Sequence, residues 1–274
     1  MKKIIFSFFT IFFSLQLAAQ TTYVEFSDKA LDYVKQDSLK KAEIFFRKAL
    51  KLEPANPRNA LLFSNLGTVQ QRMHRYDDAI ESYTYALNML PNAVSILSNR
   101  AGVYLEQGEN DRAYVDYCQI LDLDKKNINA LLMRAYIYAE RKDYKAARLD
   151  YNKLLAEAPT NYNARLGLAT LEQKEGRYKE ALEIMEKLIS ENPKDAVLYL
   201  ARANVEKDID QIRLALIDVD EAIRLSPSSS NAYLLRGELY LSQKKKYLAK
   251  LDFERAISLG ASRSDLHDLL KKSR

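Results

Sequence analysis

The sequence predicts an all-α fold built from repeated pairs of short helices, and three observations support this prediction. The chain has 274 residues, 47% hydrophobic and 29% charged, so it can bury a sizeable core. It contains only 7 glycines and 6 prolines, and Ala, Leu, Lys, Glu and Arg dominate, which favours helices joined by short turns. Finally, SNRAGVYLEQGENDRAYVDY at residues 98–117 returns 34 residues later as LMRAYIYAERKDYKAARLDY at residues 132–151.

Residues 1–20 differ from the rest of the chain and predict a signal peptide. Two lysines precede an apolar run over residues 4–17, and the small residues Ala18 and Ala19 follow. A membrane anchor is the alternative, but polar residues interrupt the run, which is shorter than the roughly 20 residues that span a bilayer. We expect cleavage after Ala19, within about two residues, and export to a bacterial periplasm. The mature chain is not expected to span the membrane, and no cysteine lies near this site to receive a lipid.

We expect the remaining residues, 21–274, to form one domain, because they share an internal period of 34 residues. A single insertion, residues 57–59, keeps the whole domain in one register. The repeats, numbered one to seven, span residues 23–56, 60–93, 94–127, 128–161, 162–195, 196–229 and 230–263.

Small and large residues alternate at fixed places of this repeat. The eighth place always holds alanine or glycine, and the twentieth always holds alanine, so two helices can approach closely there. The twenty-fourth place holds a larger residue: Phe46, Tyr83, Tyr117, Tyr151, Met185, Val219 or Phe253. Proline ends the second helix of five repeats. Before the next helix come residues that we predict to be N-caps: Asn59, Asn127, Asn161, Asp195 and Ser229.

This period, with its small residues, aromatic residues and helix-ending proline, resembles the tetratricopeptide repeat family. The resemblance covers residues 23–263. It implies a right-handed α-solenoid of seven antiparallel helix pairs, in which the first helix of each pair lines a concave groove. Residues 264–274 would then form a short solvating cap.

Arginine and aspartate occur together at two places of the repeat. The pairs are Arg100 with Asp116, Arg134 with Asp150, Arg202 with Asp218, and Arg236 with Asp252. Where the arginine is absent the aspartate is absent too, as in Leu168 with Ile184. Both places are equally far from the turn, so the two side chains should lie level and form a bidentate ion pair. We interpret these pairs as structural rather than ligand-binding, because each arginine has a matched acid.

A second set of residues on the first helices predicts a protein-binding groove. The fifth place changes from serine in repeats one to three to leucine in repeats four to seven: Leu132, Leu166, Leu200 and Leu234. Around these leucines lie Tyr136 and four amides, Asn129, Asn163, Asn204 and Asn231, which could bond a peptide backbone. The alternative is that the leucines pack against the neighbouring repeat and the asparagines only cap helices. The lysines and arginines of the family's clamp for C-terminal carboxylates are absent from this face.

The sequence offers little for catalysis, metals or nucleic acid. The only two histidines, His74 and His267, stand at no metal-ligand spacing, and no phosphate-binding glycine loop or nucleophile motif occurs. We therefore expect no enzyme, no metal and no small-molecule cofactor. Without the two signal-peptide lysines, 40 basic and 37 acidic residues leave a formal +3 spread along the chain, which argues against nucleic acid.

Two functions of different classes remain open. The first is an exported interaction module that holds a peptide or protein segment in its groove. The second is a structural adaptor of a cell-envelope complex that docks folded partners through its convex or edge surfaces. An apolar, open groove would favour the first, and an apolar patch on the second helices would favour the second.

Overall fold

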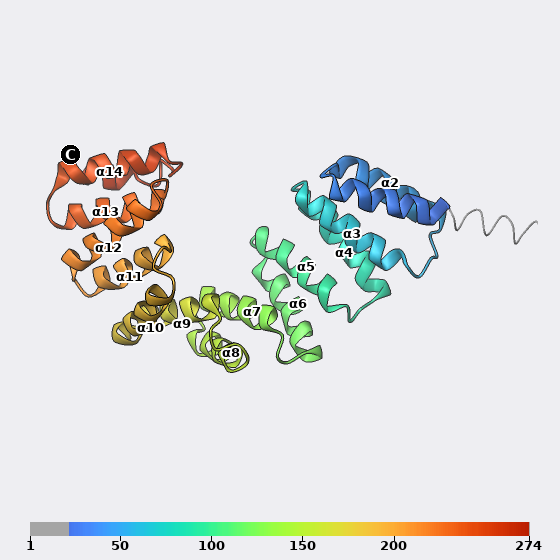
Figure 1. Cartoon of the computed structure of the whole chain (residues 1–274), viewed down its shortest axis with the longest axis horizontal. Coiled ribbons are helices and arrows are strands. Elements are labelled where there is room, and N and C mark those ends of the chain that lie inside the picture. Colours follow the sequence, from blue (N-terminus) through green and yellow to red (C-terminus); the bar gives the residue numbers. More distant parts are fainter. Residues whose placement is uncertain (1–21, 274) are drawn as a thin grey trace, which may run out of the picture. The chain divides into compact units, whose positions relative to one another are not determined.

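The computed structural model describes residues 22–273, and these residues form helices and no strand (Figure 1). The prediction of an all-α chain of consecutive helix pairs is confirmed. The predicted signal peptide lies outside the described residues. Among the described helices, none combines the length and the apolar character needed to cross a bilayer.

Each repeat contributes two helices. The first helices are residues 22–35, α3 (Asn59–Arg72), α5 (Val94–Glu106), α7 (Ile128–Glu140), α9 (Tyr162–Lys174), α11 (Ala196–Asp208) and α13 (Ser230–Ser242). The second helices are α2 (Leu39–Leu52), α4 (Tyr76–Met89), α6 (Asn110–Leu123), α8 (Tyr144–Glu157), α10 (Tyr178–Glu191), α12 (Ile212–Leu225) and α14 (Lys246–Ser258). In repeats three to seven the first helix begins at the first place of the repeat and the second helix at the seventeenth.

The chain divides into two compact parts, and the boundary falls within α7 after Ile137. The described residues of the N-terminal part are 22–137, and those of the C-terminal part are 138–273. Within each part, helices pack both inside a repeat, as α3 does on α4 and α11 on α12, and between repeats, as α4 does on α5 and α12 on α13.

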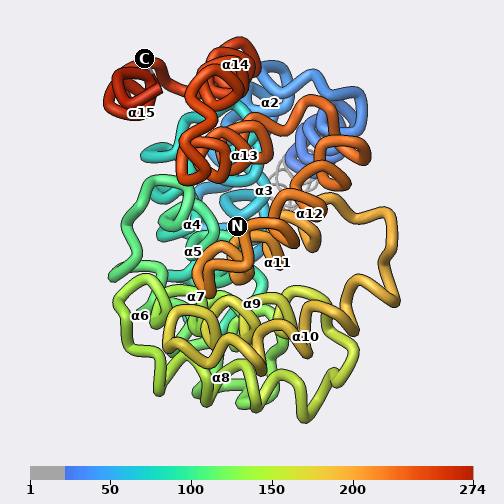
Figure 2. Tube along the Cα trace, turned by 90° about the vertical axis from the view of Figure 1, so that its left-hand side faces the viewer, coloured from blue at the N-terminus to red at the C-terminus, as the bar shows by residue number. Residues whose placement is uncertain are grey.

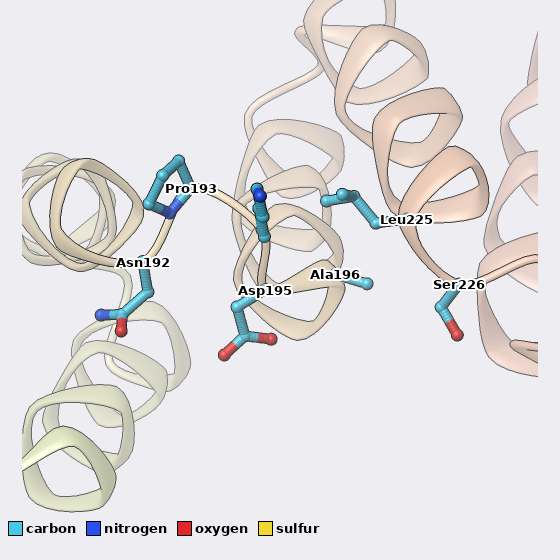
Figure 3. Close-up of a pocket in the computed structure, with 7 residues that line it drawn as sticks. Asn192, Pro193, Asp195, Ala196, Leu225 and Ser226 are labelled. Carbon is cyan, nitrogen blue, oxygen red and sulfur yellow. The ribbon is translucent and has the colours of Figure 1, made fainter.

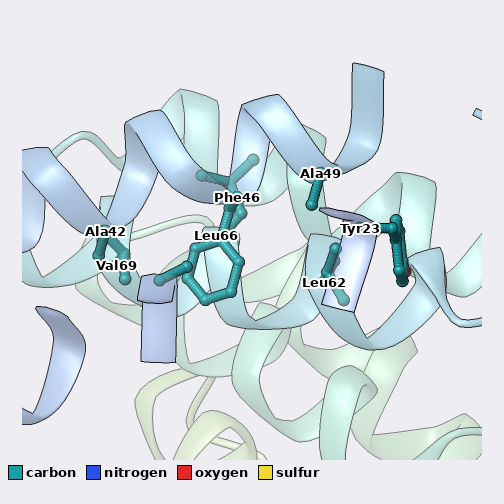
Figure 4. Close-up of a cluster of buried hydrophobic side chains, with 8 residues drawn as sticks. Tyr23, Ala42, Phe46, Ala49, Leu62, Leu66 and Val69 are labelled. Atoms are coloured by element: carbon teal, nitrogen blue, oxygen red, sulfur yellow. The ribbon is translucent and has the colours of Figure 1, made fainter. Parts of the chain in front are cut away.

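The core of the N-terminal part shows how the repeats are joined. Phe46 of α2 is fully buried and belongs to the same apolar cluster as Leu66 of α3 and Tyr23 of the first helix (Figure 4). The hydroxyl of Tyr23 donates to Asn59 Oδ1 at 3.0 Å, and Asn59 Nδ2 donates to the carbonyl of Glu53 at 2.7 Å. The predicted N-cap role of Asn59 is therefore wrong. Because of the insertion before repeat two, α3 begins at Asn59 itself. The buried side-chain amide of Asn59 links the start of α3 to repeat one.

The other four predicted N-caps accept a hydrogen bond from the first turn of the helix that follows. Asn127, Asn161 and Ser229 each accept from the backbone N–H three residues on, at 3.1, 2.9 and 3.3 Å. Asp195 accepts from the N–H of Val197 at 2.9 Å. These bonds satisfy donors that an α-helix leaves without a partner.

Small residues at the eighth place allow close packing on the twenty-fourth. A Cβ atom added to Gly67 would lie 2.9 Å from the Tyr83 ring, and one added to Gly237 would lie 2.5 Å from the Phe253 ring. Both distances are shorter than a van der Waals contact, so glycine is required where the aromatic ring approaches most closely.

The turn inside every repeat has the same backbone conformation. The fifteenth place adopts a positive φ between 56° and 76° in all seven repeats: Asp37, His74, Gly108, Lys142, Gly176, Asp210 and Lys244. Only two of these residues are glycine, so five repeats hold an L side chain in the left-handed region.

A short helix, α15 (His267–Lys272), packs on α14 at the end of the chain, where the sequence predicted a cap (Figure 2). Leu266, just before this helix, is buried. Lys271 and Lys272 are exposed, which gives the last repeat a polar outer face.

Candidate protein-binding surfaces and the buried charge network

The structure brings three of the four predicted arginine and aspartate pairs into bidentate contact. Arg100 donates to both oxygens of Asp116, at 2.9 and 2.7 Å, and Arg202 donates to both oxygens of Asp218, at 2.6 and 2.8 Å. Arg236 does the same with Asp252, with both distances at 2.8 Å. The aspartates are buried and the arginines are half-buried, so these are interior ion pairs of the helix hairpins.

The two residues of the fourth pair, Arg134 and Asp150, belong to different parts of the chain. Arg134 lies half-buried in the N-terminal part, where its Nη1 donates to Cys118 Sγ at 3.5 Å. Asp150 lies fully buried in the C-terminal part. Their ion pair remains a proposal.

Three of the arginines, Arg100, Arg134 and Arg236, also donate a hydrogen bond to the preceding repeat, a contact that the repeat pattern did not predict. Arg100 Nη1 donates to Thr84 Oγ1 at 3.1 Å, and Arg236 Nη1 donates to Asp220 Oδ1 at 2.7 Å. Thr84, Cys118 and Asp220 all occupy the twenty-fifth place of a repeat. A polar residue at this place, one repeat before each arginine, is the signal that could have revealed the link. Arg100 and Arg236 therefore each join their own hairpin to the one before it.

Repeat five replaces the pair with a different charged cluster. Leu168 and Ile184 occupy the two places, and a buried glutamate, Glu172, lies one turn further along α9. Arg148 of α8 and Arg177 both donate to this carboxylate, with Arg148 Nη2 3.1 Å from Glu172 Oε2. The glutamate thus has two cations, one of them from the preceding repeat.

Repeat six has a glutamate at the same place but lacks these cations. Glu206 is only 6% exposed, and its Oε2 atom has no hydrogen-bond partner among the described residues. Burial and the negative charge of Asp218 raise the pKa of Glu206 from 4.5 to about 7, although Arg202 acts in the opposite direction.

The predicted groove residues of the C-terminal part lie on the same face of α9, α11 and α13. Leu166, Leu200 and Leu234 are all half-buried. Leu166 packs against the cluster of Leu188, Ile189 and Leu198, and Leu200 packs against the core around Ala203 and Val219. Two of these leucines therefore contribute to packing between repeats, as the alternative interpretation anticipated.

The predicted amides differ in their availability. Asn163 and Asn231 are exposed, and Val197 occupies the equivalent place between them on α11 with 56% of its surface exposed. Asn204 Nδ2 donates to the carbonyl of Leu200 in its own helix, at 2.9 Å. In the N-terminal part, Asn129 Nδ2 donates to Ser98 Oγ at 3.0 Å, Leu132 is half-buried and Tyr136 is exposed.

Comparisons with known proteins agree with this geometry. Sequence profiles of the tetratricopeptide repeat match residues 29–56, 64–128, 138–205 and 230–260. The crystal structure of a tetratricopeptide repeat protein from Parabacteroides merdae ATCC 43184 is 36% identical, with a TM-score of 0.84. That match covers 92% of this chain and 99% of the other. The chain belongs to the tetratricopeptide repeat family.

More distant solved structures share the fold alone. PilF of Pseudomonas aeruginosa is 20% identical with a TM-score of 0.63, and the match covers 81% of this chain and 99% of PilF. A chain of the APC/C hetero-tetramer Cut9–Hcn1 is 15% identical with a TM-score of 0.66, over 94% of this chain and 55% of that one. No curated protein matches the chain.

The second helices of this tetratricopeptide repeat protein carry exposed apolar residues on their outer face. In the C-terminal part, Leu214 and Ile217 of α12 and Leu248 and Leu251 of α14 occupy the same two places of consecutive repeats, and each is at least 40% exposed. Tyr247 beside them is 72% exposed. The positive charge is not spread evenly along the chain, because four exposed lysines lie just before α14 and within it: Lys244, Lys245, Lys246 and Lys250.

A shallow pocket of about 580 Å³ lies between the loop after α10 and the end of α12 (Figure 3). Asn192, Asp195, Leu225 and Ser226 are among the residues that line it. The Asp195 carboxylate already has two hydrogen-bond partners, because it caps α11 and accepts from the hydroxyl of Tyr162 at 2.6 Å.

Residues 22–273 contain no cluster of His, Cys, Asp and Glu that could hold a metal ion.

Proposed function

We propose that this protein is an exported scaffold that binds a peptide or protein segment on the groove face of its first helices. Tetratricopeptide repeats serve as protein-interaction scaffolds, and the chain has this architecture in both of its parts. The supporting observation is the surface formed by α9, α11 and α13. There Asn163, Val197 and Asn231 are exposed beside a row of half-buried leucines. Exposed amides beside apolar side chains suit a peptide, whose backbone needs hydrogen bonds and whose side chains need apolar contact.

A second candidate is an adaptor that docks a folded partner on the outer face of repeats six and seven. The four exposed apolar side chains at equivalent places of α12 and α14 favour it. The lysines beside Tyr247 would select a partner with acidic residues around an apolar centre.

Matched variants of the full chain separate the two candidates. The groove variant combines Asn163→Ala, Asn231→Ala and Leu234→Ser. The outer-face variant combines Leu214→Ser, Ile217→Ser and Leu251→Ser. Leu166 and Leu200 stay unchanged because they pack against buried residues. Proteins that copurify with each tagged variant from its own cell envelope are quantified by mass spectrometry, and circular dichroism checks that the variants fold.

We expect the groove variant alone to lose its partner, by roughly tenfold or more, because it removes two hydrogen-bonding amides and an apolar contact. Loss in the outer-face variant alone would overturn the groove proposal in favour of the adaptor. If neither variant loses a partner, both proposals are wrong.

Export is part of the proposal and has its own test. The lysines, apolar run and small residues of the first twenty positions match what the secretion machinery recognises. Mass spectrometry of the protein from its own cells should find an N-terminus near Gln20. Folded protein that retains Met1 would contradict export.

A further inference from the structure

Repeat six contains a buried carboxyl group without a counter-ion of its own. Glu206 is at the eleventh place, where repeat five has Glu172, and both side chains are at most 6% exposed. The cations of Glu172 come from the twenty-first place of the preceding repeat, Arg148, and from the sixteenth place of its own, Arg177. For Glu206 the same two places hold Leu182 and Gln211.

The charged groups that act on this site are mostly acidic. On α12, Asp218 adds negative charge, and both of its oxygens are occupied by Arg202. On α10, the charge of Glu186 acts on the same Arg202. Arg202 therefore lies among three carboxylates, those of Asp218 and Glu206 in repeat six and that of Glu186 in repeat five.

The side chains of α13 do not change this balance. Glu238 accepts from Lys207 Nζ at 2.9 Å, so that lysine already has a partner. Arg236 is held by Asp252 at 2.8 Å and by Asp220 at 2.7 Å. A buried carboxylate that lacks a cation is strongly disfavoured, and the group takes up a proton instead.

We propose that repeat six is a proton-sensitive element, in which Glu206 binds a proton on folding and releases it with a loss of local stability as the pH rises. The proposal goes beyond the binding role and does not depend on which surface the partner uses. Because each repeat contacts only its neighbours, the effect should be strongest in α11 and α12. α11 also carries Leu200 and Asn204 of the groove face.

The sign of the effect follows from the raised pKa of Glu206. The folded chain holds this proton up to about pH 7, whereas an unfolded glutamate releases it near 4.5. The stabilising contribution is therefore complete below about pH 4.5 and is lost as the pH rises through about 7. Neither histidine lies in repeat six, since His74 belongs to repeat two and His267 to α15.

The test measures the Glu206 carboxyl and the stability of the full chain between pH 4.5 and 8.5. Carbon-detected NMR should give a Glu206 titration midpoint near 7, and hydrogen exchange corrected for intrinsic rates should show α11 and α12 opening more at pH 8 than at pH 5. Glu206→Gln should abolish that difference in opening, because it keeps the shape and removes the charge. A midpoint below about 5.5 would overturn the proposal.

Two control variants follow from the comparison with repeat five, one made in repeat five and one in repeat six. Glu172→Gln leaves Glu206 in place, so the pH-dependent opening of α11 and α12 should persist even if the variant is less stable. Gln211→Arg gives Glu206 a cation at the place of Arg177, and the Glu206 midpoint should move toward its ordinary value. If Glu206→Gln keeps the full pH-dependent opening, another group is responsible and the proposal is wrong.

Discussion

Repeats five and six lie next to each other in the C-terminal part. Their corresponding helices have the same length, but the two repeats distribute their buried charges differently. Repeat five has apolar residues, Leu168 and Ile184, at the places of the ion pair and surrounds Glu172 with two arginines. Repeat six keeps the ion pair of Arg202 with Asp218 and leaves Glu206 without a cation of its own. The same hairpin thus accepts a charged or an apolar interior at these places.

The comparison indicates that the residues at the seventh, eleventh and twenty-third places of a repeat together determine its buried charge. Repeats three and seven combine the ion pair with a tyrosine at the eleventh place, and its ring lies 5.8 Å from the Arg100 guanidinium in one and 6.0 Å from Arg236 in the other. A tyrosine adds no negative charge there, whereas Glu206 adds a second acid beside a single arginine. The surplus acid is what distinguishes repeat six.

The largest expected effect comes from removing the aspartate of an ion pair. Asp116→Ala leaves Arg100, whose side chain is 17% exposed, without its carboxylate, and should lower the free energy of unfolding by about 3 to 5 kcal/mol. Asp218→Ala should lower it by less than half as much at pH 8, because Glu206 lies one turn from Arg202 and can serve as its counter-ion. Chemical denaturation of both variants measures the difference. Equal losses would show that Glu206 does not interact with Arg202.

A smaller effect is expected when the ion pair of repeat six is replaced by the apolar residues that repeat five has at the same places. Arg202→Leu combined with Asp218→Ile copies Leu168 and Ile184 and should change the free energy of unfolding by less than about 1.5 kcal/mol. The comparison is made at pH 5, where Glu206 holds its proton and needs no cation. A loss above about 3 kcal/mol would mean that the ion pair stabilises repeat six beyond its own desolvation.

The sequence predicted the parts of this fold that depend on a single repeat. The period placed the helices, and equal distances from the turn led to the pairing of Arg100 with Asp116, which the structure brings together. Contacts between repeats were not predictable in the same way, because they depend on how one hairpin sits on the next. The bond from Arg100 to Thr84 belongs to this class. The missing cation of Glu206 is visible only after Arg148 is seen to contact Glu172 across the repeat boundary.

The smallest effect concerns the turn, where the two repeats also differ. The fifteenth place is Gly176 in repeat five, with φ at 76°, and Asp210 in repeat six, with φ at 60°. An L side chain in this region meets the neighbouring carbonyl, whereas glycine does not. Asp210→Gly should therefore raise the free energy of unfolding by about 0.5 to 1 kcal/mol, less than the full steric cost because aspartate tolerates this conformation and glycine is more flexible when unfolded. Gly176→Asp should lower it by a similar amount, and thermal melts of the two variants should shift in opposite directions by about 1 to 4 °C. Shifts in the same direction would show that the side chain at this place, rather than its φ angle, decides the stability of the turn.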